Sequence, residues 1–306
     1  MNDVVVVGSI NVDRAVDVPT APERGATLLG GAVLRGPGGK GANQAVALAR
    51  LGRSVAMVGA VGADADGEWM IATLAAEGVD TRGVLRLDSV ATGQAFVFVE
   101  PEGESTIVVA AGANGALTPA LLDAAASEAI AGARCVLAQQ EVPADVVERA
   151  AELCTGTFVL NPAPARPLSS SLLAKVDVLV PNRHELAGIA GQPGTTDLPA
   201  LEAMARKLRG PRVVVVTLGA EGALVVEEGT AYHVPALPAN AVDATAAGDT
   251  FCGALVDGLL EGKSTRQAVE WAVRAAALTT ERPGAMVSIP TRAEVEERFE
   301  PGAAVV

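Results

Sequence analysis

Val4-Val5-Val6-Val7-Gly8-Ser9-Ile10 is an almost unbroken apolar run that begins with four β-branched residues. A strand that is apolar on both faces is typical of a parallel sheet covered by helices on both sides. Similar short runs recur at residues 55–61, 135–138, 158–160, 176–180 and 213–218. Helical patterns lie between most of them, at residues 41–51, 66–77, 119–131, 144–153, 198–208, 247–260 and 265–279. This alternation predicts an α/β fold with a mostly parallel central sheet and helices on both faces.

Two regions break the alternation. Residues 14–18 with 27–34, and 92–99 with 105–109, have the pattern of short strands joined by turns such as Pro101-Glu102-Gly103-Glu104. We expect these strands, from about residues 14–34 and 92–109, to pair antiparallel and to form a small β lid over a ligand at the carboxyl ends of the core strands. No internal repeat or low-complexity linker is evident, so residues 1–306 are expected to form a single domain.

Composition and charge exclude several classes of protein. Half of the 306 residues are hydrophobic and 19% are charged, which excludes intrinsic disorder. The formal charge of -13 repels phosphate backbones and anionic lipids, so neither nucleic acid nor a membrane is an expected partner. The three cysteines are widely spaced, and no signal peptide or apolar run of about 18 residues is present. We therefore expect a cytoplasmic protein without disulfides or a cysteine zinc site.

A glycine-rich segment, Gly36-Pro37-Gly38-Gly39-Lys40-Gly41-Ala42-Asn43-Gln44, contains the pattern G-x-G-x-x-G. A dinucleotide fingerprint needs a buried strand directly before it and an acid about 20 residues later, and neither is evident here. A Walker A loop needs Ser or Thr where Gly41 stands. Two interpretations stay open: a helix start at which Lys40 and Asn43 donate to ligand hydroxyls, or a structural turn.

A second segment, Asn240 to Phe251, places small residues and Gly248 at the start of a long apolar helix. The free amides and the dipole at such a helix start suit an anion. Asp249 in the first turn either complements the helix dipole or acts as a general base beside the anion.

The third segment, Asn182-Arg183-His184-Glu185, follows a buried strand. Asn182 and Glu185 either hold magnesium through water or form a capping box at a helix start. Neither of the two histidines, His184 and His233, lies in a G-x-S-x-G or H-E-x-x-H context, which argues against a hydrolase triad and a histidine zinc site. Cys252 has the pattern of a packed apolar residue rather than of a nucleophile.

Taken jointly, these segments resemble the ribokinase/PfkB family of carbohydrate kinases. The resemblance spans nearly the whole chain and is carried, in the family's order, by residues 8–13, 38–45, 111–114, 160–166, 182 with 185, 217–219 and 246–251.

The resemblance implies roles for individual residues. The sugar hydroxyls would be bound by Asn11, Asp13, Gly39, Lys40, Asn43 and Glu141, with Val12, Gly41 and Ala42 in the same segments. Asp249 would be the base, and Ala246, Ala247 and Gly248 would form the anion hole. ATP would contact Asn182, Gly248 and the segment Thr217, Leu218, Gly219, Ala220, Glu221 and Gly222, while Glu185 would position Mg²⁺ through water. A K⁺ site would involve Asp243, Thr245, Thr279, Arg282, Gly284 and Ser288.

The activity implied by the resemblance is ATP-dependent phosphorylation of D-ribose at O5, activated by Mg²⁺ and K⁺, in a homodimer formed through the β lid. A kinase for another sugar or a nucleoside is the alternative on the same fold. An NAD-dependent oxidoreductase would rest on G-x-G-x-x-G alone. A non-catalytic sugar sensor would be expected to have lost the base or the anion hole, whereas Asp249 and Gly248 are both present.

Overall fold

The computed structural model describes residues 2–22, 24–25, 27–101 and 105–299. Its core is a nine-stranded sheet in the order β13-β12-β11-β10-β9-β8-β1-β4-β5. All neighbouring pairs from β11 to β5 are parallel, and β12 and β13 complete the other edge as an antiparallel hairpin. The strands are β1 (Val4–Val7), β4 (Val55–Gly62), β5 (Asp80–Leu87), β8 (Cys135–Gln139), β9 (Thr157–Asn161), β10 (Val178–Leu179), β11 (Val213–Thr217), β12 (Ala223–Glu227) and β13 (Thr230–Val234). The predicted mostly parallel sheet is confirmed.

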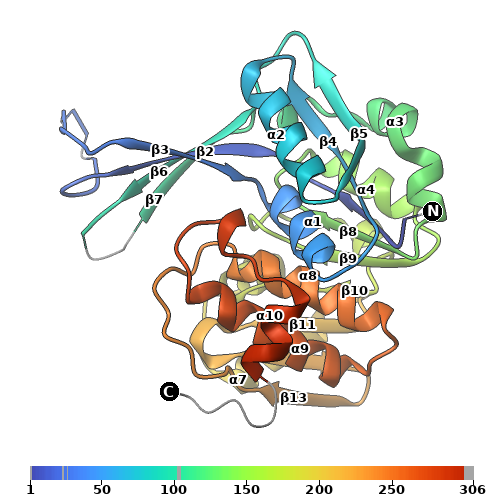
Figure 1. Cartoon of the computed structure of the whole chain (residues 1–306). Helices are drawn as coiled ribbons and strands as arrows, with labels where there is room; N and C mark the ends of the chain where they lie inside the picture. Colours follow the sequence, from blue (N-terminus) through green and yellow to red (C-terminus); the bar gives the residue numbers. More distant parts are fainter. Residues whose placement is uncertain (1, 23, 26, 102–104, 300–306) are drawn as a thin grey trace.

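Helices cover both faces of this sheet (Figure 1). Val4 and Val6 of β1 belong to one buried cluster, while Val5 and Val7 belong to the other, so β1 is apolar on both sides because both sides are covered. One face carries α1 (Lys40–Arg50), α2 (Ala65–Ala76), α8 (Ala247–Leu260), α9 (Thr265–Thr280) and α10 (Arg292–Phe299). The other carries α3 (Pro119–Gly132), α4 (Ala144–Leu153), α5 (Ser170–Leu173), α6 (Arg183–Ala190) and α7 (Leu198–Lys207). Short 3₁₀ turns are η1 (Gly112–Ala116), η2 (Gly219–Glu221) and η3 (Met286–Ser288).

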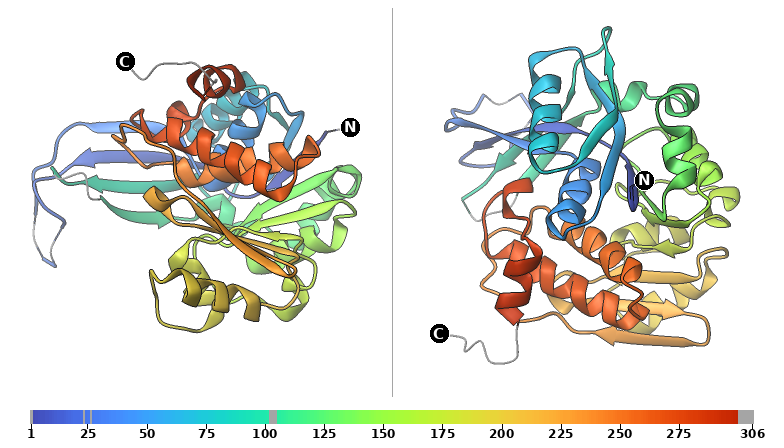
Figure 2. Two further views of the ribbon diagram at one scale, coloured as in Figure 1. Left: turned by 90° about the horizontal axis from the view of Figure 1, so that it is seen from below. Right: turned by 45° about the vertical axis from the view of Figure 1, so that its right-hand side comes forward.

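A second, four-stranded sheet projects from one side of this core (Figures 1 and 2). Its order is β3-β2-β6-β7, formed by β2 (Asn11–Asp17), β3 (Val33–Gly38), β6 (Gly93–Val99) and β7 (Ser105–Ala110). The pairs β2–β3 and β6–β7 are antiparallel, as expected, while β2 and β6 run parallel to each other in the middle. We call this sheet the lid.

Several predicted boundaries were wrong. The strand expected from residue 27 begins only at Val33 and continues to Gly38, into the glycine-rich segment. The opening strand ends at Val7, and only Val178–Leu179 of the expected strand 176–180 is in the sheet. The turn expected at Glu102-Gly103-Glu104 lies outside the described residues. These changes place Asn11 and Asp13 on the lid strand β2 rather than at the end of a core strand.

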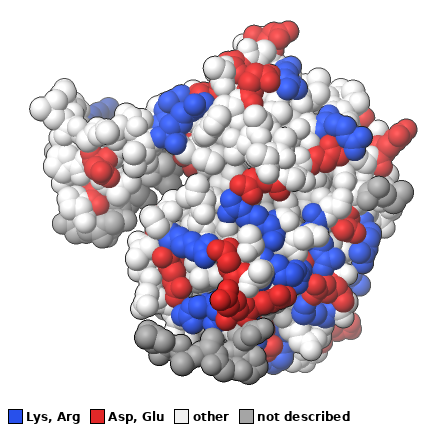
Figure 3. Space-filling model, viewed as in Figure 1, with Lys and Arg blue, Asp and Glu red and all other residues white. Residues whose placement is uncertain are grey.

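Acidic and basic side chains are interspersed over the face seen in Figure 3. Within the described residues, none of the helices combines the length and the apolarity required to span a bilayer.

Candidate active site

Asp249 lies in the first turn of α8, and the residue that caps this helix has an unusual backbone. Ala246 has φ 60°, the left-handed region that non-glycine residues rarely adopt and that is concentrated at functional sites. The Ala247 amide donates to Ala244 O at 3.2 Å, and the Thr250 amide donates to Ala246 O at 2.8 Å. The intervening amides of Gly248 and Asp249 precede the first full helical turn and so have no acceptor within the helix. Small side chains therefore leave backbone donors where an anion can approach.

Two cavities meet at Asp249 and Lys40, which line both. The smaller, of about 190 Å³, lies over the start of α8 and reaches the ends of the core strands. The larger, of about 790 Å³, lies between the core and the lid. The smaller cavity is lined by Lys40, Asn161, Ala163, Val180, Asn182, Glu185, Thr217, Ala244, Ala246, Gly248, Asp249 and Cys252. The polar side chains of the larger cavity include Asn11, Asp13, Lys40, Asn43, Glu141 and Asp249, and the lid contributes Ala95, Val97, Val99, Ile107 and Val109.

The amides in the larger cavity are held in defined orientations. Asn114 Nδ2 donates to Asn11 Oδ1 at 2.8 Å, so the NH₂ group of Asn11 is left to donate to a ligand. Asn43 Nδ2 donates to Asp249 Oδ2 at 3.0 Å, while Asn43 Oδ1 is buried without a partner among the described residues. Such an atom costs free energy unless a ligand hydroxyl donates to it. The cavity thus offers both a donor and an acceptor at fixed positions.

Glu141 adds a further acceptor beside the glycine-rich segment. Its Oε2 accepts from the Ser9 hydroxyl at 2.5 Å and from the Lys40 amide at 3.2 Å. Gly39, between β3 and α1, has φ 93°, and a Cβ there would lie 2.7 Å from the Asn11 amide. The glycine-rich segment therefore brings backbone close to the cavity instead of forming a phosphate loop.

Three carboxylates and one ammonium share this region. Burial raises the pKa of Asp249 above its usual value. The charge of Lys40 and the hydrogen bonds from Gln44 and Asn43 oppose this shift but do not cancel it. Burial, with Glu141 and Asp249 nearby, raises the pKa of Asp13 to about 7. The pKa of Lys40 is raised, chiefly by the Asp249 carboxylate, so Lys40 is a cation at neutral pH. The charge of Lys40 balances part of the negative charge around Asp249.

Asn182 and Glu185 stand at the start of α6 as a complete capping box. Glu185 Oε2 accepts from the Asn182 amide at 2.8 Å, and Glu185 Oε1 accepts from Asn182 Nδ2 at 2.9 Å. Asn182 also pairs with Thr217, which brings the segment 217–222 beside it, and Leu218 N donates to Gly222 O at 2.8 Å. The capping interpretation is confirmed, and both residues nevertheless line the smaller cavity.

The loops expected to hold a monovalent cation lie together beside the larger cavity. Asp243 Oδ1 accepts from the Thr245 amide at 2.8 Å, and Asp243 Oδ2 accepts from the Gly284 amide at 2.7 Å. Thr279 and Ser288, which flank Gly284 in the sequence, are both buried. The guanidinium of Arg282 donates to Glu294 Oε1 at 2.8 Å, so this side chain does not take part in the group. Among the described residues, no three acidic, cysteine or histidine side chains are arranged as a metal cluster.

Some expected site residues do not line either cavity. Val12 and Ala42 are fully buried in the core, and Gly41 packs against Gly8 and Ser9. Leu218 is buried as well. Conversely, sequence reasoning assigned no role to Gln44, Gln139, Asn114 and Asn161, which hold the site residues in place. The signal that could have identified them is the presence of a polar residue at the end of a buried strand or inside an apolar helix.

Comparisons with known proteins agree with this arrangement. Residues 1–292 match the model of the pfkB family of carbohydrate kinases. The chain is 40% identical over 299 residues to ribokinase from Haemophilus influenzae, covering 96% of this chain and 97% of that protein. It is 35% identical over 301 residues to deoxyribokinase from Salmonella typhi, covering 96% and 98%. The structure of Arabidopsis thaliana ribokinase complexed with ribose and ATP matches with a TM-score of 0.90 at 31% identity, covering 96% of this chain and 97% of that one. The chain belongs to the pfkB family of carbohydrate kinases.

Proposed function

We propose that the chain catalyses the phosphorylation of D-ribose by ATP at O5, giving D-ribose 5-phosphate and ADP. Residues 1–306 act as one catalytic unit in this proposal, with the lid over the sugar. The observation that carries it is the meeting of the two cavities at Asp249 and Lys40. One cavity has the fixed donors and acceptors that hydroxyl groups need, and the other has the free helix amides that phosphate needs.

The sugar binds in the larger cavity. The side-chain NH₂ group of Asn11 donates to a sugar oxygen. Asn43 Oδ1, Asp13 and Glu141 accept hydrogen bonds from sugar hydroxyls. Several such contacts fix the sugar ring and bring one primary hydroxyl to Asp249. Holding the reacting atoms in line in this way accounts for a large part of the rate acceleration. Val12, Gly41 and Ala42 support this segment from the core side.

Asp249 takes the proton of the sugar hydroxyl as the new bond from oxygen to the γ-phosphorus forms and the bond to the ADP oxygen breaks. The negative phosphoryl oxygens face the segment Ala246, Ala247 and Gly248, where the Gly248 amide has no acceptor within the helix, and they also face the Lys40 ammonium. The nucleotide occupies the smaller cavity at Asn182 and Thr217 and extends from there toward residues 218–222.

The residues at the smaller cavity fit Mg²⁺ carried by the nucleotide. Each oxygen of Glu185 accepts one hydrogen bond and keeps a lone pair, and Mg²⁺ retains several waters while taking few protein ligands. Glu185 would hold the ion through water, and the bound ion would supply positive charge at the phosphoryl oxygens.

The oxygen-rich loops near residues 243 and 284 fit K⁺. Asp243 is fixed by donors from Thr245 and Gly284, and backbone carbonyls of the neighbouring loop complete a set of hard oxygen ligands. The residues that would hold the ion are Asp243, Thr245, Thr279, Gly284 and Ser288, with Arg282 contributing through its backbone. A cation here would order the loop that precedes the anion hole.

Both faces of the lid carry apolar side chains, which favours a second copy of the chain as its partner. Val97 and Val109 face the larger cavity, whereas Val33, Phe96 and Val108 lie on the opposite face and are exposed. The outermost strands β3 and β7 also leave open edges. We propose a homodimer through the lid, and a monomer by light scattering at assay concentration would refute it.

The test of the function is ATP turnover with a panel of D-ribose, 2-deoxyribose, fructose and adenosine, each with and without K⁺ and Mg²⁺. We expect fast turnover with ribose, a 5-phosphate product by ³¹P NMR, and stimulation by both ions. Equal or faster turnover with another member of the panel would reassign the sugar while leaving the family membership intact.

A second candidate is a kinase for 2-deoxyribose, favoured by the similarity to the Salmonella typhi protein. The two sugars differ by one hydroxyl, and a site built to bond that hydroxyl rejects the sugar without it because buried polar groups lose their partner. A ribose preference of tenfold or less in kcat/KM would favour this candidate.

A further inference from the structure

Two buried glutamines lie behind the carboxylate of Asp249. Gln44 Nε2, on α1, donates to Asp249 Oδ1 at 2.9 Å and to Asn161 Oδ1 at 3.1 Å. Gln139 Nε2, at the end of β8, donates to Gln44 Oε1 at 2.6 Å. Both glutamines are 0% exposed, and neither lines either cavity. Their polar groups therefore serve other protein groups and not the substrate.

The order of these contacts gives Gln44 a single favourable orientation. An amide donates from its nitrogen and accepts at its oxygen, and a carboxylate only accepts. If the Gln44 amide were turned over, its oxygen would face the Asp249 carboxylate and its NH₂ group would face the NH₂ group of Gln139. The two acceptors, Asp249 Oδ1 and Asn161 Oδ1, therefore fix the NH₂ group of Gln44, and Gln139 supports this orientation by donating to Gln44 Oε1.

Gln139 fills space that Gly8 leaves open. A Cβ at Gly8, in the loop after β1, would lie 1.9 Å from Gln139 Oε1, an atom that is buried without a partner among the described residues. Asn161 is fixed, because its Nδ2 donates to Val180 O at 2.9 Å. Every polar atom of the Gln44 side chain thus has a partner, and Asn161 Oδ1 and Asp249 Oδ1 both accept from it.

Asp249 receives one neutral donor on each oxygen, from Gln44 on Oδ1 and from Asn43 on Oδ2 at 3.0 Å. These contacts fix the plane of the carboxylate and favour its ionised form, which burial opposes. The titratable groups that face Asp249 from the surrounding elements are Lys40 on α1, Asp13 on β2, Glu141 after β8, Glu185 on α6 and Cys252 on α8.

We propose that Gln44, held in one orientation by Asn161 and supported by Gln139, is a positioning residue that fixes Asp249 as an ionised acceptor aimed at the sugar hydroxyl. The proposal rests on the proposed role of Asp249 as the base. Gln139 contacts Gln44 but not Asp249, so Gln139 affects Asp249 only when Gln44 is present.

The test is the pH dependence of kcat, at saturating ribose and ATP, for Gln44→Met, Gln139→Met and the double variant. Methionine has nearly the shape of glutamine but cannot donate. For Gln44→Met we expect the acid limb of the profile to move to higher pH by about one to two units, the worth of one hydrogen bond to a charged group. Gln139→Met is expected to move it the same way by less. The double variant should match Gln44→Met, because coupled residues are not additive.

Gln140→Met is the matched control. Gln140 is the next residue along the chain and is 3% exposed, but its side chain makes no hydrogen bond to Asp249 or Gln44 in the described structure. We expect its profile to coincide with that of the wild type. Thermal unfolding of each variant is measured in parallel, and if Gln44→Met does not fold, Gln139→Met decides the matter.

An acid limb that stays in place in both single variants would overturn the proposal, as would an equal shift in Gln140→Met or full additivity in the double variant. These outcomes are separate from failure of the proposed function, which would show as absence of ribose turnover in the wild type. In that case the same profiles are recorded with whichever acceptor of the panel is phosphorylated.

Discussion

Asp13 lies on the lid strand β2, close to the carboxylates of Glu141 and Asp249. Burial, with those two charges, raises the pKa of Asp13 to about 7, and Lys40 lowers it. Because an ionised carboxylate accepts from two hydroxyls and a protonated one less well, we expect ribose affinity to fall as the pH falls through about 7. Calorimetric titration of ribose between pH 5.5 and 8.5 measures this. A ribose affinity that does not change with pH over that range in the wild type would refute the assignment. Asp13→Asn is the reference, and we expect it to bind ribose more weakly and with an affinity independent of pH.

The same pKa has a consequence for stability. A carboxyl group that loses its proton near pH 4 when unfolded and near pH 7 when folded makes the folded state less stable as the pH rises between these values. We therefore expect Asp13→Asn to raise the Tm of the sugar-free protein, by an amount that grows from pH 4 to pH 7 and then levels off. A Tm difference independent of pH would contradict this sign.

At the level of single residues, the sequence pointed to side chains that line the two cavities but not to those that hold them in place. Asp249 and Lys40 stand in recognisable local patterns, a helix start and a glycine-rich segment. Gln44 and Gln139 are 95 positions apart and meet only because α1 packs against the end of β8. No local pattern reports such a contact, and the fold has to be known first.

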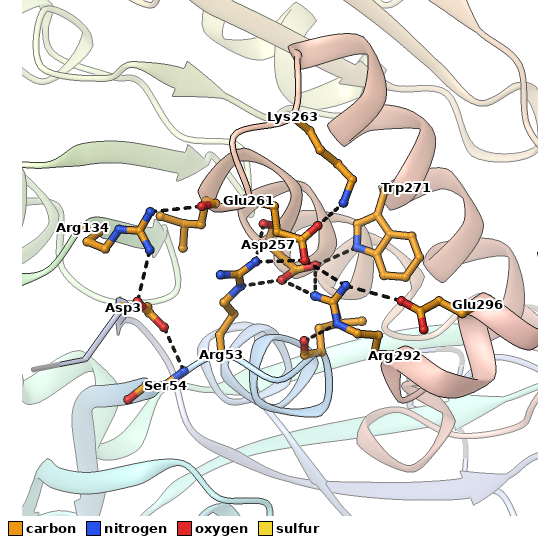
Figure 4. A network of polar contacts seen from close by, with 12 residues as sticks. Asp3, Arg53, Ser54, Arg134, Asp257, Glu261, Lys263, Trp271, Arg292 and Glu296 are labelled. Atoms are coloured by element: carbon orange, nitrogen blue, oxygen red, sulfur yellow. Dashed lines mark hydrogen bonds and ion pairs between the residues drawn. The ribbon is translucent and has the colours of Figure 1, made fainter.

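The second half of α8 is anchored by a buried network that Figure 4 shows. Asp257 is 0% exposed and accepts from Arg53 at 2.5 Å, from Arg292 of α10 at 2.7 Å and from Trp271 Nε1 of α9 at 2.9 Å. Glu261, one turn further, pairs with the same two arginines at 3.4 and 3.0 Å. The network ties the helix that carries Asp249 to three other parts of the chain.

Removing Asp257 leaves two largely buried arginines without their central counter-charge. We expect Asp257→Ala to lower the free energy of unfolding by about 3–5 kcal/mol, the usual cost of breaking a buried pair. Glu296→Ala is the control, because Glu296 contacts Arg292 at 3.7 Å and is half exposed, and an exposed pair of this kind is worth about 0–1 kcal/mol. Denaturant unfolding measures both, and equal losses would contradict the account.

Elements with strong local signals were predicted within one or two residues, among them α4, α8 and α9. The strands β5, β12 and β13 were not predicted. β5 and β13 are the two edge strands of the sheet, and both lack the continuous apolar run that marks a strand buried on both faces. β12 lies one strand in from the edge and does contain such a run, Ala223-Leu224-Val225-Val226, which was overlooked. The register of the lid was missed because glycine and proline dominate β3.

At the scale of the whole molecule, the lid is fastened to the core through α2. Asp66 accepts from Arg14 of β2 and from Arg35 of β3, each at 2.6 Å, and Arg35 also lies 3.9 Å from the ring centre of Trp69. By the strand register both arginines lie on the lid face opposite the larger cavity, so these ion pairs join that face to α2.

We expect Asp66→Asn to raise the KM for ribose several-fold while changing kcat little, because the lid would close less often over a bound sugar. The effect should shrink in high salt, where the wild-type ion pairs are themselves screened. Glu68→Gln is the control, since Glu68 lies on the same helix as Asp66 but pairs with Arg86 of the core strand β5, outside the lid. Steady-state kinetics at two salt concentrations measure this, and an unchanged KM for Asp66→Asn would argue against the fastening role.

The central claim is that Asp249 abstracts the proton of a ribose hydroxyl at the junction of the two cavities. The most direct measurement is the rate of ADP formation from ATP and D-ribose by the wild type and by Asp249→Ala, with ribose affinity determined in parallel by calorimetry. We expect kcat to fall by about 10²–10⁴-fold in the variant, the usual contribution of a general base, while ribose still binds. A variant that keeps its kcat, or one that loses turnover only because ribose no longer binds, would contradict the claim.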